Sequence, residues 1–165
     1  MARSGRYRVP HRRRREKKTN YRKRLALLKS GKVRLVVRRS LNYTYGQFVE
    51  YHRDGDRTIA AVTSKELLKF GWKGHCGNLP AAYLAGLLLG KKSNVKEAIL
   101  DIGLQRSTKG NRLYAFLKGV LDSGVNVPHD EEMLPSEDRI MGKHISEDTV
   151  KNFEAVKNKV IEWKK

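Results

Sequence analysis

The cations at the beginning of the chain are the residues best suited to chemistry, and that chemistry is the binding of a polyanion. Residues 1–40 hold 17 lysines and arginines against one acid, Glu16, so they carry +16 of the +19 formal charge of the 165-residue protein. The densest part is the run of four arginines at 12–15. Guanidinium groups clustered among aromatic rings favour nucleic acid as the partner. The alternative is a solvated basic tail, which the continuation into a patterned helix and a strand disfavours.

Two kinds of side chain near these cations add possible contacts. Tyr7, Tyr21 and Tyr43 stand among arginines, where a phenol ring can stack on an unpaired base. Tyr21 has an alternative role facing a core, whereas Tyr7 has no core to enter. Arg34 and Arg38 share the parity of a strand, so they should project from one face and extend the basic surface onto the folded part. The alternative for these two arginines is a merely solvated face.

A glycine-rich loop, GWKGHCGN, occupies residues 71–78. Its GxxGxxG spacing matches neither a P-loop nor a dinucleotide-binding fingerprint. Glycine lets the backbone come close to another element or to an RNA sugar-phosphate chain. Trp72 and Lys73 are then placed to stack on RNA and to pair with phosphate, and a core position for Trp72 is an equal alternative.

Residues for catalysis or metal binding are scattered along the chain. Cys76 follows His75, but adjacent residues rarely reach the geometry of a nucleophile and its base, and no third group orients them. The histidines lack ligand spacing, and the acids of the globular part are isolated, with Asp101 expected to be a structural acid. We therefore expect no enzyme, no metal, no cofactor and no small-molecule substrate.

Length and composition are typical of one folded domain with an appendage. The single cysteine excludes a disulfide framework and suits a reducing, cytoplasmic setting. The basic N-terminus is not followed by an apolar signal core, and no stretch reaches the roughly 20 apolar residues of a membrane helix. We expect a cytoplasmic protein with no membrane partner.

The order of elements predicts a layered α/β domain that follows a basic appendage. Residues 1–11 are expected to form an extended arm, and residues 13–30 one helix with Tyr21, Leu25 and Leu28 on its apolar face. Asp54-Gly55 predicts a hairpin turn. The expected strands are 33–39, 45–51, 57–62 and 98–104, the last of the interior parallel type, and the expected helices are 64–70, 79–90, 113–121 and one from about 146 onward.

Capping residues mark several of these helix starts. Thr63 and Glu66 have the spacing of a capping box, and Asn78 and Ser146 can each cap the helix that follows. The final helix has an apolar stripe that we expect to cover its own domain, with a neighbouring protein as the alternative. The chain is therefore divided into a basic arm and helix (1–31), a globular α/β core (32–129), and an acidic link with a C-terminal helix (130–165).

Four segments carry a resemblance that covers most of the chain. They are RYRVPHRRRREKKTNYRKRLALLKSGKVRLVVRRS (6–40), FGWKGHCGNLPAAYLAGLLLG (70–90), EAILDIGL (97–104) and FLKGVLDSGVNVPH (116–129). Together they closely resemble archaeal-type members of the 5S-rRNA-binding protein family of the large ribosomal subunit, called large-subunit protein eighteen.

The resemblance implies a mixed α/β sandwich similar to ribonuclease H, without the active-site acids of that enzyme. It implies a structural protein of the cytoplasmic ribosome that binds 5S rRNA, helps seat it in the central protuberance, contacts large-subunit rRNA and neighbours large-subunit protein five. The positions implied to contact RNA are Arg3, Arg6, Tyr7, Arg8, Arg12, Arg13, Arg14, Arg15, Lys17, Lys18, Tyr21, Arg22, Lys23, Arg24, Arg34, Arg38, Arg39 and Ser40, with Trp72 and Lys73 as a weaker pair.

Two alternatives from other classes make distinct demands. A nuclease on the same type of fold requires three or four carboxylates converging on the sheet and metal-dependent cleavage of RNA. A general DNA-binding protein requires equal affinity for duplex DNA and 5S rRNA at matched salt. Both are weaker hypotheses than rRNA binding.

Overall fold

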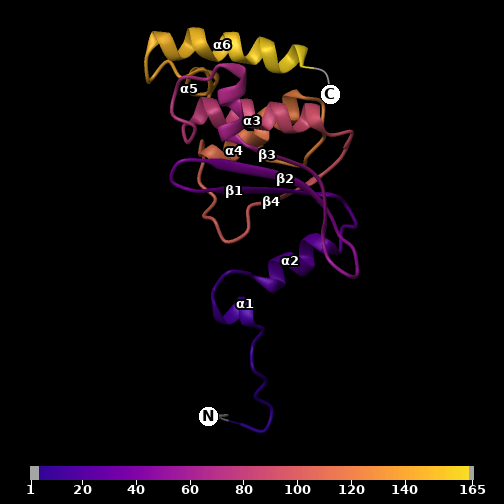
Figure 1. Ribbon diagram of the computed structural model, residues 1–165. Coiled ribbons are helices and arrows are strands. Elements are labelled where there is room, and N and C mark those ends of the chain that lie inside the picture. The colour runs from indigo at the N-terminus through magenta and orange to yellow at the C-terminus, as the bar shows by residue number, and fades with distance from the viewer. Residues whose placement is uncertain (1–3, 164–165) are drawn as a thin grey trace.

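Four strands form a single mixed sheet (Figure 1). The computed structural model describes residues 4–163, and its strands are β1 (Arg34–Arg39), β2 (Thr44–Glu50), β3 (Arg57–Thr63) and β4 (Ile99–Asp101). They lie in the order β3-β2-β1-β4, with β4 parallel to β1 and the other neighbours antiparallel. The predicted turn at Asp54-Gly55 lies between β2 and β3, and the left-handed φ of 149° at Gly55 explains the glycine.

The helices cover mainly one face of this sheet, so the fold is a layered mixed α/β arrangement (Figure 1). They are α1 (Arg12–Arg15), α2 (Tyr21–Leu28), the 3-10 helix η1 (Ser64–Phe70), α3 (Leu79–Lys92), α4 (Arg112–Asp122), the 3-10 helix η2 (Glu131–Met133), α5 (Glu137–Met141) and α6 (Glu147–Glu162). Among residues 4–163, none of these helices combines the length and the apolar character that a bilayer span needs.

Helices α3 and α4 pack closely together between the sheet and α6. Residues 80–90 are all buried, as expected for a helix that is apolar nearly all round. The two backbones meet at glycines: a Cβ on Gly86 would lie 2.0 Å from the Phe116 carbonyl oxygen, and one on Gly119 would lie 2.1 Å from that of Tyr83. The helix pair therefore depends on the absence of side chains at these two positions.

The predicted helix starts are confirmed. The Asn78 side chain accepts a hydrogen bond from the backbone of Ala81, and Thr63 and Glu66 form the capping box of η1. Ser146 caps α6. Each cap satisfies amide groups that the first turn of a helix leaves without partners.

Helix α6 forms an outer layer over α3 (Figure 1). Phe153, Val156 and Val160 are buried, and the Phe153 ring lies 5.6 Å from the ring of Tyr83. The prediction that the final helix covers its own domain is confirmed. The acidic stretch before it is folded rather than extended, because it contains η2 and the beginning of α5, whose Ile140 reaches the core.

The single helix predicted over 13–30 is wrong, since the structure has two helices there. Lys17 adopts a φ of 53°, which interrupts the helix, and the Asn20 side chain accepts from the backbone of Lys23 to begin α2. Asparagine competes with helical hydrogen bonding and favours such caps. No residue from 4 to 33 is buried, and α1 and α2 lie on the side of the sheet opposite α3, α4 and α6 (Figure 1).

The strand predicted over 98–104 is parallel to β1 as expected, but it lies at the edge of the sheet rather than in its interior and covers only three residues. Gly103 has a φ of 62°, and its backbone amide donates to the Asp101 carboxylate at 2.9 Å. This turn ends β4 beside the open face of the sheet. The carboxylate of a buried strand residue is thereby placed next to the N-terminal helices.

Candidate nucleic-acid interface

The basic segment, residues 4–24, holds eleven lysines and arginines, and all of them except Arg24 are exposed. All four arginines of α1 are exposed. Glu16 is the one acid in the segment; it lies 2.9 Å from the Lys18 ammonium and 3.9 Å from the Arg12 guanidinium. One carboxylate cannot neutralise so many cations, so the segment presents a strong positive potential to the solvent.

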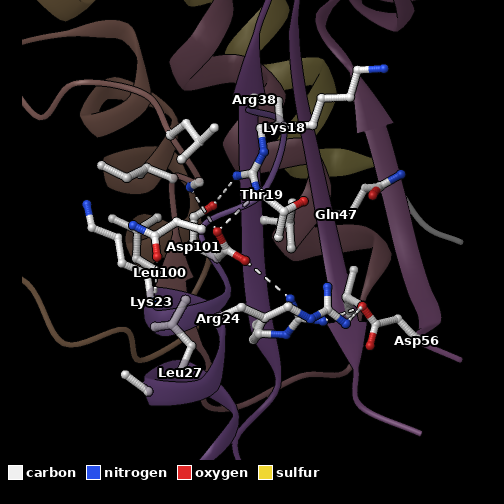
Figure 2. Close-up of a pocket in the computed structure, with 18 of the residues that line it drawn as sticks. Lys18, Thr19, Lys23, Arg24, Leu27, Arg38, Gln47, Asp56, Leu100 and Asp101 are labelled. Carbon is white, nitrogen blue, oxygen red and sulfur yellow. Dashed lines mark hydrogen bonds and ion pairs between the residues drawn. The ribbon is translucent and has the colours of Figure 1, made fainter. Parts of the chain in front are cut away.

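A groove separates α2 from the open face of the sheet (Figure 2). We call it the α2 groove, and its volume is about 510 Å³. Its walls come from residues 18–27, from β1, β2 and β3, and from the chain around β4. Arg13 reaches it from α1, so the groove is continuous with the basic segment.

An ion-pair network joins α2 to the sheet at the base of this groove (Figure 2). Arg34 is only 3% exposed, and its two Nη atoms lie 3.2 Å from Asp101 Oδ2 and 2.6 Å from Asp56 Oδ2. Arg24 reaches the same Asp56 oxygen at 2.8 Å, and Arg38 reaches Asp101 Oδ1 at 3.0 Å. The buried charges are therefore paired, as burial requires.

Electrostatics around Asp56 follow from this pairing. Burial alone would raise the pKa of the Asp56 carboxyl, but the hydrogen bonds and charges of Arg34 and Arg24 outweigh it. The pKa therefore lies below its ordinary value of 3.8. Asp56 remains a carboxylate at neutral pH and continues to hold α2.

Comparison with known proteins gives a family match and a similar protein. A family profile described as "Ribosomal large subunit proteins 60S L5, and 50S L18" matches residues 5–97 and 91–130. The chain belongs to this family. The large ribosomal subunit protein uL18 of Korarchaeum cryptofilum (strain OPF8) is 61% identical to it over 149 residues, which cover 88% of this chain and 76% of that relative.

Membership of the family has direct consequences. The chain is a structural, non-enzymatic protein of the large subunit of the cytoplasmic ribosome, and its partners are rRNA and other ribosomal proteins.

Burial raises the pKa of the Cys76 thiol, which disfavours the thiolate that a nucleophile needs. Asp101 is the structural acid that was predicted, because two arginines hold it.

Many positions predicted for RNA contact are exposed in the structure of this family member. Arg3 lies outside the described residues. Lys73 is exposed at the glycine-rich loop, and Arg39 and Ser40 are exposed at the end of β1. The exposed positions of the basic segment are Arg6, Tyr7, Arg8, Arg12, Arg13, Arg14, Arg15, Lys17, Lys18, Arg22 and Lys23.

The prediction for Arg34 needs correction. Arg34 and Arg38 do share one face of the sheet, and both line the α2 groove. Arg34 is buried under α2 and bound by two carboxylates, so it holds the fold together rather than offering a free charge to a phosphate. Arg38 is 39% exposed at its side chain and also binds Asp101, and Arg24 is half-buried against Asp56.

The predicted apolar face of the first helix is also wrong. Tyr21 does not enter the core: it is half-buried, and its ring lies 5.1 Å from that of His11. Leu25 is 57% exposed, whereas Leu27 lines the α2 groove. The short α2 turns a different side toward the sheet, the side that carries Arg24 and Leu27.

Trp72 cannot stack on RNA, because it is 2% exposed and packs in the core. The core alternative is the one observed. The glycines of the loop serve this packing: Gly71 ends η1 at a φ of 90°, and a Cβ on Gly74 would lie 2.9 Å from the Trp72 ring. The loop is therefore a packed corner that leaves Lys73 on the surface.

Sequence reasoning missed Asp56, Gln47 and Arg112. Asp56 follows a hairpin turn, where an acid normally indicates only solvent exposure. Gln47 lies in a strand whose alternating pattern gave no sign of a groove. Arg112 donates to the backbone carbonyls of Gly77 and of the β1–β2 turn, which ties the glycine-rich loop to α4. No local signal reveals such long-range partners.

Proposed function

We propose that the protein binds 5S rRNA and helps attach it to the large-subunit rRNA in the central protuberance, beside large-subunit protein five. The observation that carries the proposal is the basic segment. All its cations except Arg24 are exposed, Glu16 is the one acid within it, and it lies on the side of the sheet that the outer helices leave open. The resemblance to the 5S-rRNA-binding family supplies the identity of the RNA.

Phosphate contacts from the basic segment supply most of the affinity. Each neutralised phosphate releases counterions, so about ten contacts predict a slope of about −7 for log affinity against log salt on single-stranded RNA. The shape of the folded RNA and a few unstacked bases supply selectivity. Tyr7, 52% exposed between two arginines, is suited to stack on such a base.

A second contact region is proposed at the opposite end of β1. Arg39 and Ser40 are exposed there, and Lys73 is exposed on the glycine-rich loop. The Arg112 guanidinium binds the carbonyl of Gly77 within this loop and, at 3.5 Å, that of Ser40. Arg39 and Lys73 can therefore approach RNA from a fixed part of the fold rather than from the basic segment.

We propose a separate role for each of three segments of the chain. Residues 1–31 form the RNA-binding arm and helices, residues 32–129 a core that we expect to share the ribonuclease H arrangement, and residues 130–165 the C-terminal appendage. The two sheet-side carboxylates of the core, Asp56 and Asp101, are paired with arginines instead of being available to metal ions. This pairing supports a binding role for the fold.

Filter binding of the full chain tests the proposal. The probes are 5S rRNA, an unrelated structured RNA of similar length, and duplex DNA, all at two matched salt concentrations. We expect 5S rRNA to bind at least about tenfold more tightly than either control, since selectivity comes from RNA shape and unstacked bases. Equal affinity for all three would identify a general polyanion-binding protein and reject the proposal.

A further inference from the structure

We infer that the α2 groove holds one unstacked nucleotide of the bound RNA, with its base between α2 and the sheet and its phosphate on the cationic rim. This inference rests on the proposed function and extends it. Phosphate contacts along the basic segment do not require any pocket. The groove would add a site that accepts a single base.

The α2 groove is a space that the protein leaves unfilled. No residue of α2 is buried, so the helix does not close the space between itself and the sheet. The ion pair from Arg24 to Asp56 holds the helix above the sheet, and Figure 2 shows the side chains around the open space. The volume of about 510 Å³ falls within the roughly 300–1,000 Å³ of small-ligand pockets.

The walls of the groove suit the flat ring of a base. Val36 and Val49 contribute apolar surface from the sheet, Leu100 from β4, and Leu27 from α2. Figure 2 shows Leu27 and Leu100 on the same side of the space, next to α2. Arg38, whose side chain is 39% exposed, adds a planar guanidinium of the kind that stacks on bases.

The charge of the groove selects an anion. Six cations line it against two carboxylates, which leaves a formal +4. The carboxylates, Asp56 and Asp101, are already paired with arginines. Within the described residues, Lys23 and Arg13 have no carboxylate within 4 Å, so their charges remain for a phosphate.

Polar side chains are present to read the edge of the base. Gln47 and Thr58 line the groove, and the hydrogen bonds formed within residues 4–163 include neither of their side chains. An amide offers both a donor and an acceptor, as the edge of a base does. In Figure 2 the Gln47 side chain extends from the sheet on the side away from Asp101.

An unstacked nucleotide fits better than the alternatives. A base within a duplex is stacked and cannot enter a narrow groove, whereas loops and bulges present bases that are turned outward. An acidic protein segment would match the charge but not the continuity of the groove with the basic segment, which reaches it through Arg13 and Lys18. The RNA strand held by that segment passes the mouth of the groove.

Groove-filling substitutions in the full chain test the inference. Val36→Phe and Thr58→Phe each add a ring to the groove without changing any charge, and Thr58 is exposed, so its substitution should leave folding intact. Ile59→Phe is the matched control, because Ile59 is 46% exposed on the same strand and does not line the groove. We expect about tenfold weaker binding of 5S rRNA by both groove variants, at an unchanged salt slope, and wild-type binding by the control.

Photo-cross-linking to 5S rRNA that contains 4-thiouridine gives an independent readout on the wild-type chain. We expect cross-linked peptides from β1 or β2 in addition to the basic segment. Cross-links confined to residues 4–24, together with wild-type affinity of both groove variants, would overturn the inference. Protein–protein cross-links in assembled subunits that join another ribosomal protein to residues of the α2 groove would also overturn it.

The outcomes separate this inference from the proposed function. If the wild-type chain binds 5S rRNA no better than unrelated RNA, the proposed function fails. If the wild-type chain is selective and the groove variants bind normally, only the nucleotide in the α2 groove is rejected.

Discussion

Arg34 Nη1 lies 3.2 Å from Asp101 Oδ2, which joins the two parallel strands β1 and β4 on the face of the sheet that carries α2. The arginine is 3% exposed, and its Nε is buried without a hydrogen-bond partner among the described residues. Its charge is therefore tolerated only because Asp101 and Asp56 both bind it. Asp101, which the sequence predicted to be a structural acid, and Asp56, which sequence reasoning missed, hold the floor of the α2 groove.

Asp101→Ala should destabilise the fold strongly. Removing one partner of a buried ion pair leaves uncompensated charge, so we expect a loss of about 3 kcal/mol in the free energy of unfolding, measured with urea. Asp54→Asn is the matched control, because its carboxylate is 89% exposed and its loss should change stability by less than about 0.5 kcal/mol. Equal stability of the two variants would show that Arg34 does not depend on Asp101.

Acid should weaken the attachment of α2. The pKa of Asp56 is lowered in the folded protein, so its contribution to stability is complete above about pH 4, near the unfolded value of 3.8. That contribution is lost as the pH falls through the lower folded pKa. Urea unfolding between pH 7 and pH 2.5 should show this decline, and Asp56→Asn should flatten it. An Asp56→Asn profile as steep as that of the wild type would contradict the assignment.

Neutralising α1 should change the salt dependence of RNA binding without changing stability. Replacing Arg12–Arg15 with glutamine removes four exposed cations and buries nothing new. If all four meet phosphates, the slope of log affinity against log salt should become less negative by about 3. Filter binding at several salt concentrations measures the slope. Replacing the exposed Lys65 and Lys69 of η1 is the control and should leave it unchanged.

The close approach of α3 and α4 should not tolerate a methyl group. A Cβ at position 119 would lie 2.1 Å from the Tyr83 carbonyl oxygen and 2.8 Å from the Leu87 nitrogen, both backbone atoms that cannot easily move. Gly119→Ala should therefore cost about 1–3 kcal/mol in unfolding free energy, despite the better helix propensity of alanine. Gly5→Ala, with open space around it, should have no effect in the same urea measurement.

The outer helix should contribute to the stability of the whole domain. Phe153 is 2% exposed and packs on α3, so Phe153→Ala should cost about 3–5 kcal/mol. Ile161→Ala removes an apolar side chain from the exposed side of the same helix and should have little effect. A small effect at position 153 in thermal or urea unfolding would mean that α6 is only loosely attached.

Local sequence was sufficient for much of the architecture. The Asn78 cap, the capping box of Thr63 and Glu66, and the Asp54-Gly55 turn each depend on residues within a few positions of one another. The stripe of the final helix could be assigned to a core in the same way. The concentration of positive charge before residue 40 is a property of composition, so it needed no structure to locate.

Tertiary structure decided which of the predicted residues are accessible. Arg34 and Trp72 have types that suit RNA contact, and both are buried by partners that lie far away in the chain, as Asp101 is 67 positions from Arg34. The α2 groove likewise arises where α2 meets the sheet through Arg24 and Asp56, which are 32 positions apart. Short-range patterns carry no record of such contacts, because burial and ion pairing depend on which distant segments the fold brings together.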